Sequence, residues 1–403
     1  MRPVVQRSLL QSGPATPLVK PAILAKGFRP FFLLAAAQAA VVMPIWVLAL
    51  RGGMNPGAYF GATFWHAHEM LFGFALAVIA GFLLTAIGNW TSRETATGKL
   101  LAVLAAVWLA GRVAPLVADR LPRFVPAAVD LAFLPLLAWA CARPIVTARN
   151  QRNYQFVVML SLLFLGNLAM HLGSLGIWAE GSRKGAWLAT YVIIAMIVVM
   201  TARVVPMFTR NATDQQTIRN QPRLDTAAIA GVVGAALADL ASFDERIVGA
   251  LAALAGILVL ARSLTWGTLH TFRSPLLWIL HLGHGFIALG FLLRASMAVT
   301  PAFTASAALH AFTAGAIGSL TLGMMARVSL GHTGRMLAVK PVSSVAFGAV
   351  VVAALLRVFG PLGGNVAYRH SMTAAGVLFA LAFIAYLVVY VPMLLAPRVD
   401  GKP

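Results

Sequence analysis

Apolar residues occur along this chain in continuous runs rather than in alternation with polar ones. Each run is about 20 residues long, which is the length of an α-helix that crosses a bilayer. Membrane-spanning β-strands would instead show alternating apolar and polar residues in runs of about ten. Because lipid offers the backbone no hydrogen-bond partner, the pattern predicts an all-α, polytopic transmembrane bundle.

We expect about 12 spans of this length in a single membrane domain over residues 27–398. A basic, polar segment (1–26) precedes this domain, and a short tail (399–403) follows it. The segment 224–242 is the weakest, because it is short and rich in Ala and Gly. The predicted spans are 29–50, 62–88, 100–118, 124–142, 154–178, 186–208, 224–242, 247–266, 275–298, 303–328, 341–360 and 371–396.

The distribution of charge predicts how the chain is oriented. If the N-terminus is cytoplasmic, 21 of the 31 Lys and Arg residues fall on the cytoplasmic side of these spans. Positive residues accumulate in cytoplasmic loops, so both termini are expected inside. The net charge of +20 arises in short loops between apolar runs. It therefore indicates contact with anionic lipid headgroups rather than with nucleic acid.

Composition excludes several classes of protein. Of all residues, 60% are apolar and only 10% are charged, against roughly 25% charged in an average soluble domain. A soluble enzyme and a disordered protein are both excluded. The single cysteine, Cys141, rules out an internal disulfide and a thiolate cluster. Any bound metal must therefore be held by His, Met or carboxylate side chains.

Histidines carry the candidate chemistry, because an ionisable residue within a span is a functional hypothesis by default. Six of the nine lie inside predicted spans, while His270, His332 and His370 lie at span ends or in loops. Four of the six share the outer third of the bilayer, and the two on span nine lie deeper and share one helix face. The six candidate metal ligands are His66, His68, His171, His281, His284 and His310.

Neutral imidazole is the commonest metal ligand and suits iron and copper. Hydrogen bonding between helices is the alternative role for these histidines. Glu69 follows His68 directly and is the best intramembrane carboxylate for carrying protons. Its alternative role is an ion pair with a nearby arginine.

Spans two and ten share the pattern His-x4-Gly-x7-Gly, beginning at His68 and at His310. Small residues at this spacing permit the close approach of a helix or a flat cofactor. Two such helices would hold a haem between His68 and His310. Arg112 and Arg294 lie toward the outer surface and would pair with its propionates, or else position the helices at the headgroups. No Cys-x-x-Cys-His is present, so such a haem would be bound non-covalently, as b-type haem.

Several strings along the chain are typical of one protein family, namely GFRPFF (27–32), WHAHEMLFGF (65–74), GFLLTA (81–86), NWT (89–91), RVVPMFTRN (203–211), HLGH (281–284), HAFTAG (310–315) and MMARVSLGHTGR (324–335). On these strings the chain resembles, along nearly its whole length, the NnrS family of haem- and copper-containing bacterial inner-membrane proteins. The resemblance implies haem, copper, about twelve spans and a part in the bacterial response to nitric oxide.

Three hypotheses follow from the sequence. The first is a metal-binding protein in which His68 and His310 hold haem, while His281 and His284, with His66 or His171, hold copper or a second haem. Such a protein binds nitric oxide and, if it is an oxidoreductase, reduces it with protons carried by Glu69 and electrons from an unidentified donor. The second is a permease or metal exporter, with Glu69, Asp130 and Asp239 as its intramembrane acids. The third is a sensor or protection protein that binds haem without turnover.

Overall fold

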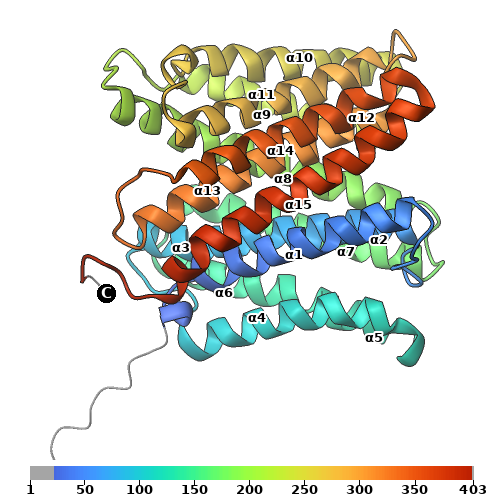
Figure 1. Cartoon of the computed structure of the whole chain (residues 1–403), viewed down its shortest axis with the longest axis horizontal. Helices are drawn as coiled ribbons and strands as arrows, with labels where there is room; N and C mark the ends of the chain where they lie inside the picture. Colours follow the sequence, from blue (N-terminus) through green and yellow to red (C-terminus); the bar gives the residue numbers. More distant parts are fainter. Residues whose placement is uncertain (1–21, 402–403) are drawn as a thin grey trace, which may run out of the picture.

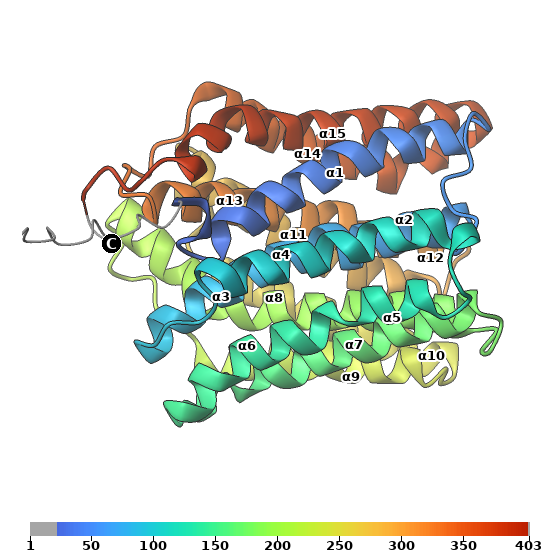
Figure 2. The same ribbon diagram turned by 90° about the horizontal axis from the view of Figure 1, so that it is seen from below.

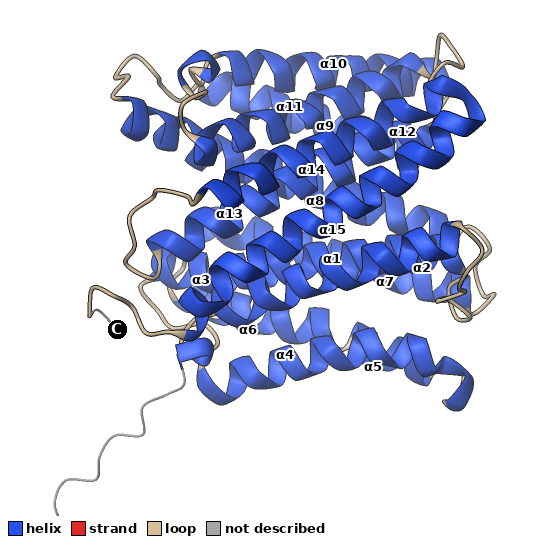
Figure 3. Ribbon diagram, in the orientation of Figure 1, coloured by secondary structure: helices blue, strands red, loops and turns tan. Residues whose placement is uncertain are grey.

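The computed structural model describes residues 22–401, so most of the basic segment 1–26 and the last two residues of the tail lie outside the described chain. Every regular element in the described residues is helical, and none is a strand (Figure 3). The helices run roughly along one direction and pack side by side as a bundle (Figure 1). The all-α expectation is confirmed.

The first half of the chain contributes six segments to the bundle. They are α1 (Phe28–Leu50); the long helix formed by α2 (Ala62–His68), η2 (Glu69–Ala75) and α3 (Leu76–Thr91); α4 (Gly98–Val113) with η3 (Ala114–Arg120); α5 (Val125–Leu131) with α6 (Phe133–Thr147); α7 (Tyr154–Ser174); and α8 (Gly181–Thr213).

The second half contributes six more. They are α9 (Pro222–Leu240); α10 (Glu245–Leu264); α11 (Pro275–Ser296); the long helix formed by α12 (Ala305–His310), η6 (Ala311–Ile317) and α13 (Gly318–Gly331); α14 (Pro341–Phe359); and α15 (Gly364–Leu395). Seen from below, α15 and α1 lie on one side of the bundle and α7 and α9 on the other (Figure 2).

Ten segments of the described chain are long and apolar enough to cross a membrane. One of them, Pro341–Leu395, is 55 residues long and contains both α14 and α15. The helix α9 is of comparable length, but it carries Arg223, Asp225 and Asp239 and is not among the ten. These two places account for the difference from the predicted count. The helices begin and end within a few residues of the predicted spans elsewhere.

Two π-helical segments interrupt the long helices at matching places. The segment η2 begins directly after His68, and η6 begins directly after His310. Each contains the first glycine of the shared sequence pattern. A Cβ atom on Gly73 would lie 2.7 Å from Nε2 of Gln38, and one on Gly315 would lie 2.5 Å from the ring of Phe286. The glycines therefore allow side chains of α1 and α11 to approach the two π-segments, and π-segments are frequent at functional sites.

Candidate metal centre

A buried polar cluster lies where α2, α4, α5 and α7 meet. His68 ends α2, Arg112 is on α4, Asp130 is on α5, and Asn167 and His171 lie on α7. Asn167 and His171 are four residues apart, so both side chains project from the same face of α7. All five are at most 6% exposed. Burying so many polar groups is costly unless they are paired.

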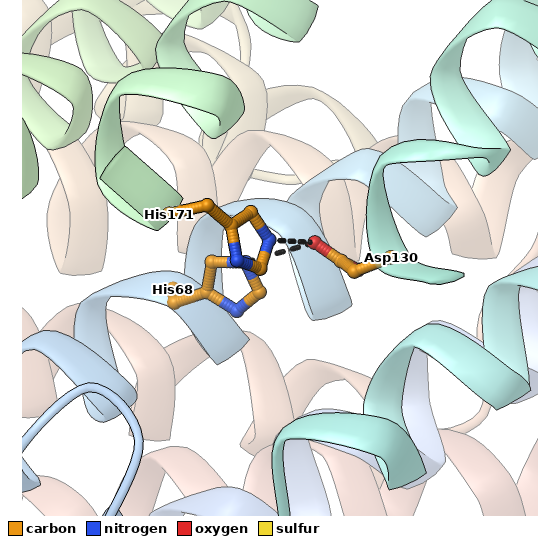
Figure 4. A group of neighbouring side chains, drawn as sticks. All are labelled: His68, Asp130 and His171. Atoms are coloured by element: carbon orange, nitrogen blue, oxygen red, sulfur yellow. Dashed lines mark hydrogen bonds and ion pairs between the residues drawn. The ribbon is translucent and has the colours of Figure 1, made fainter. Parts of the chain in front are cut away.

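The two imidazoles converge on one carboxylate oxygen. Nε2 of His68 lies 3.1 Å from Oδ2 of Asp130, and Nε2 of His171 lies 2.9 Å from the same atom. Figure 4 shows both rings directed at this oxygen from separate helices. Together the three residues offer ligand atoms that all lie within 4.8 Å of one another. They form a candidate site for a metal ion, which we call the triad.

Further hydrogen bonds hold Asp130 in place. The Asn167 amide donates to Oδ2 at 2.8 Å, and its carbonyl oxygen lies 2.9 Å from Nε2 of His68. The guanidinium of Arg112 donates to Oδ1 of Asp130. A Cβ atom on Gly111 would lie 2.6 Å from that same Oδ1. Asp130 can therefore reach Arg112 only because residue 111 has no side chain.

Glu69 joins the cluster from the first position of η2. Its Oε1 lies 3.1 Å from Nδ1 of His68 and accepts a hydrogen bond from Arg112 at 2.9 Å. Its Oε2 accepts from the Gln38 amide of α1 at 2.5 Å. The predicted ion pair with an arginine is therefore present, alongside a direct contact with a histidine.

The loop between α1 and α2 covers one side of the triad. The hydroxyl of Tyr59 lies 3.0 Å from Nδ1 of His171, and the ring of Phe60 stacks on His68 with centroids 4.2 Å apart. Burial and the nearby Asp130 carboxylate raise the pKa of Tyr59 to about 12. The phenol therefore stays protonated at neutral pH and remains available to hydrogen-bond His171.

The other predicted ligands lie elsewhere. Nε2 of His281 is 2.9 Å from the hydroxyl of Thr209, and its Nδ1 is 2.9 Å from that of Thr268. His284 packs against Trp266, with ring centroids 4.5 Å apart. Among the described residues, neither histidine contacts the triad, and both make the helix-to-helix contacts that were the alternative prediction.

The two arginines expected to meet propionates are both paired within the chain. Arg112 binds Glu69 and Asp130. Arg294 donates to Asp239 at 2.7 Å and to Glu245 at 2.9 Å. The described contacts do not join His68 to His310. Counting residues along the predicted spans places His68 and His171 at compatible depths, but it does not assign Asp130 to the same site.

The sequence pattern did not indicate that three further residues belong to the site, namely Asn167, Gln38 and Tyr59. The spacing of Asn167 and His171, one turn apart on an otherwise apolar helix, was a usable signal. Tyr59 lies in a loop, where no periodicity indicates a partner.

Comparison with known proteins agrees with the sequence analysis. The chain matches the protein family described as "NnrS protein" over residues 22–398. No curated protein matches it. The match spans all the helices described above, including every residue of the triad.

Proposed function

Because this chain belongs to the NnrS protein family, we propose that it acts in the bacterial response to nitric oxide, binding the gas at a copper centre held by His68, Asp130 and His171. The observation that carries the proposal is the convergence of two buried imidazoles on one carboxylate oxygen. Imidazole and carboxylate are both ligands that copper accepts.

The charge of the cluster favours a bound cation. Arg112 contributes a charge of +1, and Asp130 and Glu69 contribute −1 each. The cluster therefore has a net charge of −1 when both histidines are neutral. An uncompensated charge at such depth is costly. A monovalent copper ion or a proton on His68 would neutralise it. The two imidazole nitrogens lie 2.9 and 3.1 Å from the carboxylate oxygen, so the three donor atoms are close enough together to bind one cation.

In His68 and in His171, the second ring nitrogen has a hydrogen-bond partner, as a metal-binding imidazole requires. A ligating histidine almost always donates its other N–H to a neighbouring acceptor, which sets its tautomer and orientation. In this chain Nδ1 of His68 faces Glu69, and Nδ1 of His171 faces Tyr59. Both Nε2 atoms are then directed at the centre of the site.

Replacing Tyr59 by phenylalanine is expected to weaken metal binding by about 10–100-fold, because His171 loses the group that orients it. Competition with a copper chelator measures this. Tyr154→Phe is the matched control, since Tyr154 begins α7 and its hydroxyl makes no hydrogen bond within the described chain. Equal copper affinity in the two variants would argue against the role of Tyr59.

Copper bound at the triad would supply an open coordination position for a small neutral gas and a one-electron couple. The protein supplies the rest of the chemistry. Phe60 and Phe72 pack around His68 and keep water from it. Glu69 stands beside His68, where its carboxylate can hold a proton for any reduction of the gas.

Haem does not fit the pair first expected to bind it. Both ring nitrogens of His68 face protein groups, namely Glu69 on one side and Asp130 with Asn167 on the other. His68 therefore has no free nitrogen directed toward His310.

We also propose that the chain crosses the inner membrane twelve times, with both termini in the cytoplasm. Arg29 at the start of α1 donates to the carbonyl oxygens of Leu394 and Ala396 at 2.7 and 2.6 Å, so both ends of the described chain lie at one face. This requires an even number of passes. Counting α9, α14 and α15 separately raises the ten segments to twelve.

The experiment is to purify the full chain after growth with copper and haem, and to measure bound metal and the optical and electron paramagnetic resonance spectra before and after adding nitric oxide. We expect bound copper and a spectral change with the gas. Consumption of the gas with an electron donor would separate turnover from binding alone. Protein without any bound metal, or copper uptake into vesicles without retention, would contradict the proposal and favour a permease.

A further inference from the structure

An apolar cavity lies where the two halves of the chain meet. Its volume is about 90 Å³, and its walls come from α1, α3 and α8 of the first half and from α11 and α13 of the second. Each of these helices belongs to a segment that is long and apolar enough to cross a membrane. In the wall, Leu280 and Val205 are at most 1% exposed. The cavity therefore lies inside the spanning part of the bundle.

No polar group faces into this cavity. Of the described residues that line it, only Thr201 and Thr321 have polar side chains. Their hydroxyls donate to carbonyl oxygens of their own helices, at 2.9 Å to Ile197 and at 2.6 Å to Ile317. A buried water needs about two to four polar partners, so a cavity without any stays dry.

The size and the lining of the cavity limit what can occupy it. A lipid headgroup or the ring of a quinone would lose its hydrogen bonds to water and find no new partner in these walls. The cavity of about 90 Å³ is also smaller than one of roughly 150 Å³ that holds a single benzene ring. An acyl chain or an isoprenoid tail is therefore too large. A neutral apolar molecule of a few atoms fits.

On one side the cavity reaches the surface of the bundle. Phe82 of α3, Val204 of α8 and Met324 of α13 line it and are only partly buried. The methionine side chain is unbranched and adapts its conformation readily. The cavity is thus closed toward the membrane by a few apolar side chains, at least one of which can move aside without breaking a hydrogen bond.

We propose that this cavity binds a small, neutral, apolar gas that enters from the lipid. That the gas is nitric oxide rests on the proposed function. An uncharged diatomic molecule of low polarity is transferred favourably from water into an apolar environment. Val78 in the cavity wall and His68 in the triad are ten residues apart on one long helix, which is roughly 15 Å at about 1.5 Å per residue. The cavity therefore concentrates the gas near the triad without including any of its three residues.

Xenon is the probe, because it is a neutral apolar atom that enters dry cavities. Crystals of the full chain are pressurised with xenon, and anomalous scattering locates the bound atoms. Val78→Phe and Val204→Phe fill the cavity from α3 and from α8. Val158→Phe is the matched control, since Val158 is 58% exposed on α7 and does not line the cavity. We expect xenon in the cavity of the wild type and the control, and its loss from both filled variants.

A variant with the opposite effect guards against misfolding of the filled ones. Leu320 lines the cavity and is 3% exposed, so Leu320→Ala should enlarge it. We expect this variant to hold more xenon than the wild type. Absence of xenon from the wild-type cavity, electron density for water or for an acyl chain in its place, or unchanged xenon in Val78→Phe and Val204→Phe would overturn the proposal.

Nitric oxide itself separates this proposal from the first. After rapid mixing with the gas, Val78→Phe and Val204→Phe should change their spectra several-fold more slowly than the wild type, with the same copper content. If copper is retained and the rates are equal, the cavity does not supply the gas and the triad stands. If no variant holds copper, yet xenon occupies the wild-type cavity and not the filled ones, the proposed function is wrong and the gas cavity stands.

Discussion

Replacing Asp130 by asparagine should remove the metal of the triad and cost about 1–3 kcal/mol of stability, the usual cost of leaving buried hydrogen-bonding groups without a matching partner. The change is nearly isosteric, so its effect is on charge. Arg112 loses one of its two carboxylates, and the cluster changes from −1 to neutral. Both imidazoles then lose the anionic oxygen on which they converge. Copper affinity should fall at least about 100-fold, more than the loss of an outer-shell partner causes.

Copper titration and thermal unfolding in detergent measure the two effects separately. Asp239→Asn is the matched control, because Asp239 also pairs with a buried arginine, Arg294, at a place without histidines. The control should lose stability while keeping its copper. Normal copper affinity in Asp130→Asn would show that the triad is a structural hydrogen-bond cluster only.

Replacing Gly111 by alanine should have the second largest effect on stability and copper affinity. The Cβ of Gly111→Ala would lie 2.6 Å from Oδ1 of Asp130 and 3.1 Å from its Cα atom. The Cα atom belongs to the backbone of α5 and cannot rotate away, so α4 and α5 must separate. Overpacking of this kind typically costs about 1–3 kcal/mol. Because the displaced residue is Asp130, copper affinity should also fall, by about tenfold for each 1.4 kcal/mol of binding free energy lost.

Gly234→Ala provides the control for Gly111→Ala. Gly234 also lies within a helix, α9, but a Cβ atom there meets nothing within 4 Å. Alanine should leave stability unchanged or raise it by about 0.5–1 kcal/mol, because glycine loses more backbone entropy on folding. If both alanine variants bind copper alike, the close approach of Gly111 to Asp130 has no functional part.

The fold class could be predicted from the sequence, because in lipid the secondary structure of each spanning segment is determined by that segment alone. Each span must satisfy its own backbone hydrogen bonds, so every apolar run of sufficient length predicts a helix by itself. Hydropathy was least decisive at α9, where three charges fall on a short helix. The π-segments were not predicted, although the glycines within them had been noted, because apolar periodicity does not distinguish a π-turn from an α-turn.

The site was partly predictable. Depth in the bilayer can be counted along a helix, and it placed His68 and His171 at one level, where the structure brings their rings to 5.4 Å. Depth does not say which helices are neighbours or which way a side chain faces. His66 and His68, two residues apart, therefore meet different partners. The ring of His66 stacks on Trp46 of α1, while Asp130 and Asn167 meet His68 from α5 and α7.

The sequence by itself determined that this is a helical membrane protein with buried histidines at set depths, because helix formation in lipid and the rise along a helix are local. Only the tertiary structure decided which histidine meets which carboxylate. The helix surfaces that face lipid and those that face other helices are similarly apolar, so hydrophobicity does not select which helices become neighbours. That choice depends on the packing of small residues, such as Gly111 against Asp130. The pairing of buried charges follows from that packing, and so does the position of the metal centre we propose.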